Sequence, residues 1–162
     1  MGKILYVDLE KCTGCRSCEL VCSERHYGEY NPAKSRITVF RSAPQASYVP
    51  VFCTQCEDAW CQGICPNGAI SREHVNGSWI VRVSKAKCVG CKVCLLACPF
   101  GNMSFVTERR KVQKCDLCEG EPECVTACLA GALQFKEAEV STMHQKRATA
   151  AKIMESYQEV SY

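Results

Sequence analysis

Two stretches of the sequence decide the fold: CTGCRSCELVC at residues 12–22 and CVGCKVCLLAC at residues 88–98. Both place four cysteines in the spacing C-x2-C-x2-C-x3-C. Two further stretches, CTQCEDAWCQGIC at residues 53–65 and CDLCEGEPECVTAC at residues 115–128, repeat the pattern with a longer second gap of four and five residues. The 162-residue chain therefore carries its 16 cysteines as four groups of four, numbered one to four in chain order.

This spacing is typical of cysteines that ligate cubane iron–sulfur clusters. Three cysteines in a tight loop turn their sulfur atoms toward one cube, and the fourth is expected on an emerging helix that points to a neighbouring cube. Sixteen thiolates, at four per cluster, predict four [4Fe-4S] clusters. Structural zinc is the alternative, but zinc sites use two ligand pairs separated by a longer loop and fit these groups poorly.

The chain also repeats itself on a larger scale. Groups one and three align at an offset of 76 residues, and groups two and four both end in a Gly-Ala-aliphatic sequence. Short strands are expected in ILYVDL and WIVRVS, before groups one and three, and a hairpin is expected in SRITVFR and YVPVF. Pro66 and Pro99 are expected to end the short helices that carry Cys65 and Cys98.

Composition excludes several classes of protein. Without cysteine, the hydrophobic share falls from 47% to roughly 37%, so clusters are expected to stabilise the fold. No apolar run approaches the roughly 18 residues of a membrane-spanning helix, and no export signal is visible, so we expect a cytoplasmic protein without a membrane span. Bound clusters would turn the formal charge of +3 into roughly −5, so no nucleic acid is expected as a partner.

Residues outside the cysteine groups carry no motif for catalysis. No nucleophile–base constellation, phosphate loop or dinucleotide fingerprint is present, and no group lacks a cysteine that would leave an iron open to substrate. We therefore expect an electron carrier rather than an enzyme. His26 is expected at the surface, close enough to tune a cluster. A solvated turn, or a surface that steers an anionic partner, is expected from four basic residues, Arg109, Arg110, Lys111 and Lys114.

With these motifs, residues 1–136 resemble the four-cluster ferredoxin-like electron-transfer subunits of molybdenum and tungsten oxidoreductases. Relatives of this type include the iron–sulfur subunits of dimethyl sulfoxide reductases, the β subunits of formate dehydrogenases, the ferredoxin-like partner of carbon monoxide dehydrogenase and the polyferredoxin subunit of tungsten aldehyde oxidoreductases. The resemblance implies an α+β fold with two bacterial 2[4Fe-4S] ferredoxin-like modules in tandem. Residues 1–45 with 104–136 would carry groups one and four, and residues 46–103 would carry groups two and three.

The repeats alone leave the pairing of the groups open, because group one could pair with two and group three with four. In the family that the sequence resembles, the pairing is nested. That pattern implies four ligand sets, which are Cys12, Cys15, Cys18 and Cys128 for cluster 1; Cys22, Cys115, Cys118 and Cys124 for cluster 2; Cys53, Cys56, Cys61 and Cys98 for cluster 3; and Cys65, Cys88, Cys91 and Cys94 for cluster 4.

The resemblance also implies partners. A large catalytic subunit with a tungsten or molybdenum cofactor is expected, an aldehyde oxidoreductase being the first candidate, with a flavin subunit or a soluble ferredoxin as a further partner. The alternative is a free-standing polyferredoxin or a redox-sensing adaptor. The tail at residues 137–162 has apolar residues at near-helical spacing and is expected to form an amphipathic helix that docks on this chain or on another subunit.

Overall fold

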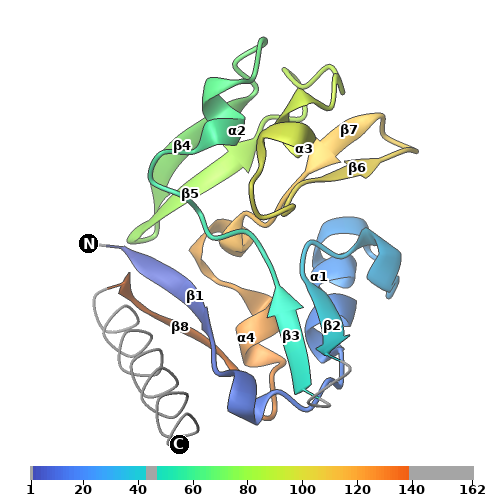
Figure 1. Ribbon diagram of the computed structural model, residues 1–162, viewed down its shortest axis with the longest axis vertical. Helices are drawn as coiled ribbons and strands as arrows, with labels where there is room; N and C mark the ends of the chain where they lie inside the picture. Colours follow the sequence, from blue (N-terminus) through green and yellow to red (C-terminus); the bar gives the residue numbers. More distant parts are fainter. Residues whose placement is uncertain (1, 43–46, 139–162) are drawn as a thin grey trace, which may run out of the picture.

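The structure is a computed structural model that describes residues 2–42 and 47–138 (Figure 1). The strands in these residues are β1 (Lys3–Val7), β2 (Thr38–Ser42), β3 (Ser47–Val51), β4 (Ile70–Val75), β5 (Ser78–Val83), β6 (Ser104–Val106), β7 (Lys111–Gln113) and β8 (Leu133–Glu137). The helices are α1 (Ser17–Tyr27), α2 (Trp60–Gly63), α3 (Val93–Ala97) and α4 (Glu123–Thr126), with short 3-10 turns η1 (Leu9–Lys11), η2 (Pro32–Lys34) and η3 (Leu117–Gly120).

The strands pair two by two in antiparallel sheets, β1 with β8, β2 with β3, β4 with β5 and β6 with β7. The predicted α+β class is confirmed, as are the two strands before groups one and three and the hairpin between groups one and two. Most of the predicted C-terminal helix, residues 139–162, lies outside the described residues.

Helices pack in the nested order of the cysteine groups. Helix α1, which carries Cys18 and Cys22 of group one, packs against α4 of group four, and α2 of group two packs against α3 of group three. Figure 1 shows the two halves: α2, α3 and β4–β7 lie at one end of the molecule, and α1, α4, β1–β3 and β8 lie at the other.

Each half has a small apolar core, and β5 contributes to both. Ile80, with 0% of its surface exposed, packs with Leu5, Val39 and Leu133 in the group one/four half. Its neighbour Val81, 1% exposed, packs in the other half, where the remaining buried members are Ala69, Ile70, Cys88, Cys94, Met103 and Val112. Successive side chains of a strand point to opposite faces, so one strand joins the two cores.

The prediction that Cys65 and Cys98 lie on helices is wrong. Helix α2 ends at Gly63, and Cys98 already has extended backbone angles of φ −79° and ψ 111°. The physical reason is the proline that follows each cysteine, because a residue before proline is sterically driven out of the helical region. Helix α2 therefore ends two residues, and helix α3 one residue, earlier than expected.

The basic run is only partly a solvated turn. Arg109 and Arg110 are exposed in the turn between β6 and β7, as expected. Lys114 is 3% exposed, which contradicts the prediction for this residue. Among the described residues, no helix has the length and hydrophobicity required to cross a membrane.

Candidate metal centres

The cysteines gather in quartets, each with three members from one group and the last cysteine of another. Three cavities show this directly, and their cysteines are Cys12, Cys15, Cys18 and Cys128 in the first, which we call quartet 1; Cys53, Cys56, Cys61 and Cys98 in quartet 3; and Cys65, Cys88, Cys91 and Cys94 in quartet 4. Four thiols facing one cavity form the donor set of a [4Fe-4S] cluster.

We call the remaining cysteines, Cys22, Cys115, Cys118 and Cys124, quartet 2, because α1, which carries Cys22, packs against α4, which carries Cys124. Burial, followed by interactions that include Cys22, raises the pKa of Cys115 to about 12 and also raises the pKa of Cys118. For Cys124 the pKa is raised by burial and by the charges of Cys115, Cys118 and Cys22. Of the four sets implied by the sequence resemblance, three each line one cavity, and quartet 2 has Cys22 and Cys124 on helices that pack together.

Neighbouring quartets are connected by contacts within the fold. The packing of α1 on α4 connects quartet 1 with 2, and the packing of α2 on α3 connects quartet 3 with 4. Lys114 lines the quartet 3 cavity and donates to the carbonyl oxygen of Cys115, which connects quartet 2 with 3. The quartets therefore form a series along the molecule.

Burial raises the pKa of several of the thiols. It raises the pKa of Cys18 to about 12 and that of Cys94 to about 11, while hydrogen bonds with Ser17 lower the pKa of Cys15. Thiols with raised pKa values are protonated at neutral pH, so metal binding must release their protons.

The last cysteine of every group accepts a main-chain hydrogen bond at its sulfur atom. The four N–H···S pairs are Arg36 to Cys22 at 3.3 Å, Ala69 to Cys65 at 3.3 Å, Asn102 to Cys98 at 3.4 Å and Leu133 to Cys128 at 3.4 Å. Hydrogen bonds to ligand sulfur are one of the factors that set iron–sulfur potentials.

We did not predict these N–H donors from the sequence, although the Gly-Ala-aliphatic ending repeated after groups two and four could have indicated them. Gly68 and Gly131 have φ angles of 55° and 62° and donate to the carbonyl oxygens of Cys65 and Cys128, at 3.1 and 2.9 Å. The resulting turn sends the chain back so that the following N–H groups face the sulfur atoms. Glycine adopts this left-handed conformation without the steric cost of a side chain.

Two other glycines allow a hairpin to cover a cysteine loop. A Cβ atom on Gly14 would lie 2.4 Å from the Tyr48 ring of β3, and one on Gly90 would lie 2.3 Å from the carbonyl oxygen of Arg110 in the β6–β7 turn. Both glycines also have positive φ, 71° and 72°. Groups one and three therefore use the same glycine position for close approach by different hairpins.

Exposure differs along the series of quartets. Only Cys15 of quartet 1 and Cys91 of quartet 4 are exposed, while the other cysteines are buried or half-buried. Each outer quartet therefore has one exposed cysteine, and the inner quartets have none. Lys114, which lines the quartet 3 cavity and donates to the carbonyl oxygen of Cys115, lies between quartets 2 and 3.

The structure also corrects the prediction that His26 is a surface residue. Only 13% of its side chain is exposed, and its Nε2 atom lies 3.5 Å from Oδ1 of Asp116. Burial, followed by the charge of Arg36, lowers the pKa of His26 to about 4, so it is neutral at neutral pH. Ligand atoms of His26, Asp116 and Cys118 lie within 4.8 Å of one another, but Cys118 already belongs to quartet 2.

The cysteine quartets, their N–H···S hydrogen bonds and the small paired sheets define an iron–sulfur protein of ferredoxin type. The chain belongs to the 4Fe-4S dicluster domain family, whose model matches residues 44–138, and a 4Fe-4S binding domain matches residues 3–24. Its sixteen cysteines fit four [4Fe-4S] clusters, and it is an iron–sulfur electron-transfer protein of the kind found as subunits of oxidoreductase complexes.

Individual relatives agree with this assignment. YsaA of Escherichia coli (strain K12) is 41% identical over 159 residues, which cover 91% of this chain and 98% of the relative. Electron transport protein HydN of the same strain is 35% identical over 158 residues, 82% of this chain and 87% of the relative. The polyferredoxin-like subunit of an aliphatic sulfonate oxidoreductase from Pyrococcus furiosus is 42% identical over 119 residues, 74% of this chain and 67% of the relative.

Proposed function

We propose that the chain transfers electrons within an oxidoreductase complex and that catalysis takes place on a partner subunit. The observation that carries the proposal is the series of four cysteine quartets with exposed cysteines, Cys15 and Cys91, only at its two ends. When bound, clusters supply one-electron acceptor sites. The chain itself holds these sites in sequence and exposes a cysteine to partners only at the outer two.

We further propose the nested ligand sets, with quartets 1 to 4 holding clusters 1 to 4. The supporting contacts are the packing of α1 on α4 and of α2 on α3, together with the cavities lined by quartets 1, 3 and 4. The proposed modules are residues 1–45 with 104–136 and residues 46–103. The β6–β7 hairpin also packs against the second module, because Val112 belongs to its core.

The proposed partner is a large catalytic subunit with a tungsten or molybdenum cofactor, an aldehyde oxidoreductase being the first candidate, with a flavin subunit or a soluble ferredoxin as a further partner. Support comes from the motifs shared with subunits of such enzymes and from the Pyrococcus furiosus relative, which is named as a subunit of an oxidoreductase. We propose the cytoplasm as the compartment, since a reducing environment keeps free the thiols that clusters require.

Double substitutions distinguish nested from sequential pairing. Anaerobic preparations should contain about sixteen iron and sixteen sulfide, and Cys22→Ala, Cys124→Ala or Cys61→Ala alone should each retain about twelve iron. Under nested pairing Cys22→Ala with Cys124→Ala still removes one cluster, whereas Cys22→Ala with Cys61→Ala removes two and leaves about eight iron. The reverse pattern would establish sequential pairing, and electron paramagnetic resonance of the reduced variants identifies which signals persist.

Native purification tests the partner. The proposal expects a large subunit at fixed stoichiometry that contains tungsten or molybdenum, measured by elemental analysis of the anaerobic complex. A lone monomer with a full complement of iron would contradict it and support a free-standing polyferredoxin instead.

A further inference from the structure

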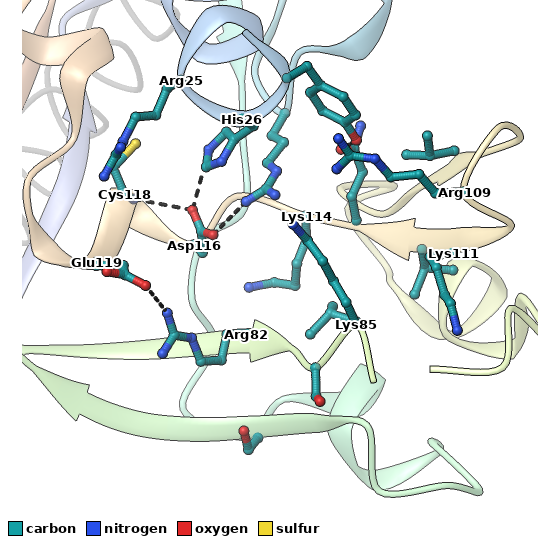
Figure 2. Close-up of a pocket in the computed structure, with 18 of the residues that line it drawn as sticks. Arg25, His26, Arg82, Lys85, Arg109, Lys111, Lys114, Asp116, Cys118 and Glu119 are labelled. Atoms are coloured by element: carbon teal, nitrogen blue, oxygen red, sulfur yellow. Dashed lines mark hydrogen bonds and ion pairs between the residues drawn. The ribbon is translucent and has the colours of Figure 1, made fainter. Parts of the chain in front are cut away.

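A further cavity of the described residues lies beside quartet 2 and shares one wall residue each with the cavities of quartets 3 and 4, Lys114 and Val112. It has a volume of about 620 Å³ and is lined by α1, by β4, β5 and β7, and by the segments that follow β5 and precede η3. Pockets for small molecules commonly have volumes of about 300–1,000 Å³. Figure 2 shows that charged side chains dominate its wall, and we call it the basic cavity.

Positive charge exceeds negative charge in the basic cavity. Seven lysine and arginine side chains line it against three carboxylates, Glu73, Asp116 and Glu119, a net charge of +4 with His26 neutral. The carboxylates are already engaged, since Asp116 pairs with Arg36 at 2.5 Å and Glu119 pairs with Arg82 at 2.6 Å. Glu73 also pairs with Arg82, at 3.3 Å, so one arginine accounts for two of the three carboxylates.

Several cations therefore remain without a carboxylate partner. Within residues 2–42 and 47–138, this is true of Lys85, Arg109 and Lys111. Arg109 instead lies over the Tyr27 ring, 4.1 Å from its centroid, and the Lys111 amine donates to the carbonyl oxygen of Cys88. In Figure 2, Lys85 rises from the end of β5 and Arg109 approaches from the opposite wall.

A buried hydrogen-bond donor in the wall of the cavity also favours a bound ligand. Only 8% of the Arg36 side chain is exposed, and its Nε atom has no hydrogen-bond partner. Buried donors without a partner are rare in folded proteins, so such an atom calls for a ligand or an ordered water.

Cluster charge alone does not account for these cations. Cys118 of quartet 2 is the one cysteine in the wall, and the hydrogen bond of the Lys111 amine to the Cys88 carbonyl oxygen places that lysine beside quartet 4. The amine of Lys114 donates to main-chain oxygens beside quartets 2 and 3, and its charge is explained by that position. Lys85 and Arg109 belong to segments that carry no member of quartet 2.

We propose that the basic cavity binds a small molecule that carries two or more phosphate groups. Arginine forks match phosphate oxygens in a bidentate manner, and lysines add point charges. A concave site of this volume suits a compact polyanion better than the flat surface of a protein partner. The site goes beyond the proposed electron-transfer function and needs no partner subunit.

One consequence rests on the proposed ligand set of cluster 2. An anion beside Cys118 disfavours the extra negative charge of a reduced cluster, so binding lowers its reduction potential. By linkage, reduction must weaken anion binding by the same factor. The affinity of the cavity for the anion would then depend on the redox state of cluster 2.

The test uses inorganic pyrophosphate and the anaerobic, iron-loaded chain, with calorimetry as the readout. We expect one saturable site that is weakened about tenfold or more by Lys85→Gln with Arg109→Gln, because two unpaired cations are removed. The matched control, Lys3→Gln with Arg41→Gln, removes two exposed cations outside the cavity and should change affinity less than about twofold. Unchanged iron content in both double variants shows that they remain folded.

Two results would overturn the site: wild-type chain that shows no saturable pyrophosphate binding, or an equal loss in the control variant. Binding of a glutamate-rich peptide in the absence of pyrophosphate binding would also overturn it and indicate an acidic protein partner. Repeating the titration after dithionite reduction tests the coupling, and equal affinity in both states would refute it. An iron count that contradicts four clusters would leave pyrophosphate binding intact, so the two proposals fail separately.

Discussion

The β4–β5 hairpin and the β1–β8 pair hold equivalent positions in the repeat but are built differently. In each pair, the strand that follows one cysteine group meets the strand that precedes another, and the register joins Ile70 with Val83 and Leu133 with Val7. The first pair is closed by a two-residue turn at Asn76 and Gly77, whose φ angles are 47° and 77°. These positive angles fit the turn type that matches strand twist.

The second pair has no such turn, because it joins segments from the two ends of the described chain (Figure 1). Closing a long loop costs more conformational entropy than closing a short one. The strand pair beside quartets 3 and 4, β4–β5, is therefore formed by residues close in the sequence. The pair beside quartets 1 and 2, β1–β8, depends on a contact between distant segments. This difference predicts unequal stability of the two halves.

The largest effect is expected from a matched pair of core substitutions, Leu133→Ala and Ile70→Ala. Both residues are 3% exposed, both begin a strand and both follow a Gly-Ala sequence. Such truncations of buried side chains lower the free energy of unfolding by about 2–5 kcal/mol. We expect Leu133→Ala to release iron to a chelator faster than Ile70→Ala, because no tight turn keeps β1 and β8 together.

Hydrogen exchange measured by mass spectrometry would locate the weakened half in each variant. The control is Leu129→Ala, which truncates a leucine with 97% of its surface exposed and should change stability by less than about 0.5 kcal/mol. Equal rates of iron release from the two core variants would show that chain connectivity does not distinguish the halves.

Glycine-to-alanine substitutions give a smaller effect and compare the two covering hairpins. Gly90→Ala should lower the free energy of unfolding by about 2–3 kcal/mol, more than Gly14→Ala. Its Cβ atom would lie 2.3 Å from the Arg110 carbonyl oxygen, and the backbone cannot move aside. Gly14→Ala meets the Tyr48 ring, which has a rotatable side chain, and should cost about 1–2 kcal/mol. Thermal unfolding of the anaerobic proteins measures both.

Gly131→Ala isolates the conformational strain, because its φ is 62° and no atom lies within 4 Å of the added Cβ. It should cost about 1 kcal/mol. A Gly14→Ala variant less stable than Gly90→Ala would mean that the β2–β3 hairpin is the more rigid cover.

Local sequence patterns predicted the elements whose causes are local. The strands β1 and β5 follow from β-branched residues before a cysteine loop, and the spacing within each group predicted how three cysteines share one cavity. The ends of the helices before Cys65 and Cys98 were predictable from the prolines that follow, but the helices were predicted to extend two residues and one residue too far.

Features that depend on distant segments were not predictable in this way. A run of basic residues is typical of a solvated surface, and nothing in the run indicates that the Lys114 amine meets the carbonyl oxygen of Val81 from β5. His26 is similarly buried against Asp116 from group four. The basic cavity combines residues of five separate segments, so no motif describes it.

The smallest effect concerns Lys114, which lies where the two halves meet. Its amine donates to the carbonyl oxygens of Val81 and Cys115 and lies 3.2 Å from Oε1 of Gln55, and no carboxylate of the described residues pairs with it. Burial raises the pKa of Cys61 in quartet 3, and the charge of Lys114 opposes this rise. A buried cation at this position should stabilise the reduced state of the inner clusters more than that of the outer ones.

Lys114→Gln keeps a donor of similar reach and removes the charge, so the reduction potentials of clusters 2 and 3 should fall by tens of millivolts, where about 59 mV corresponds to a tenfold change for one electron. Redox titration monitored by electron paramagnetic resonance measures the shift, and Lys3→Gln, at an exposed position in β1, is the matched control. A shift confined to one inner cluster would assign the lysine to that half alone. A joint shift of both inner clusters, with the outer two unchanged, would mean that the contact between the halves also sets the potentials at the centre of the series.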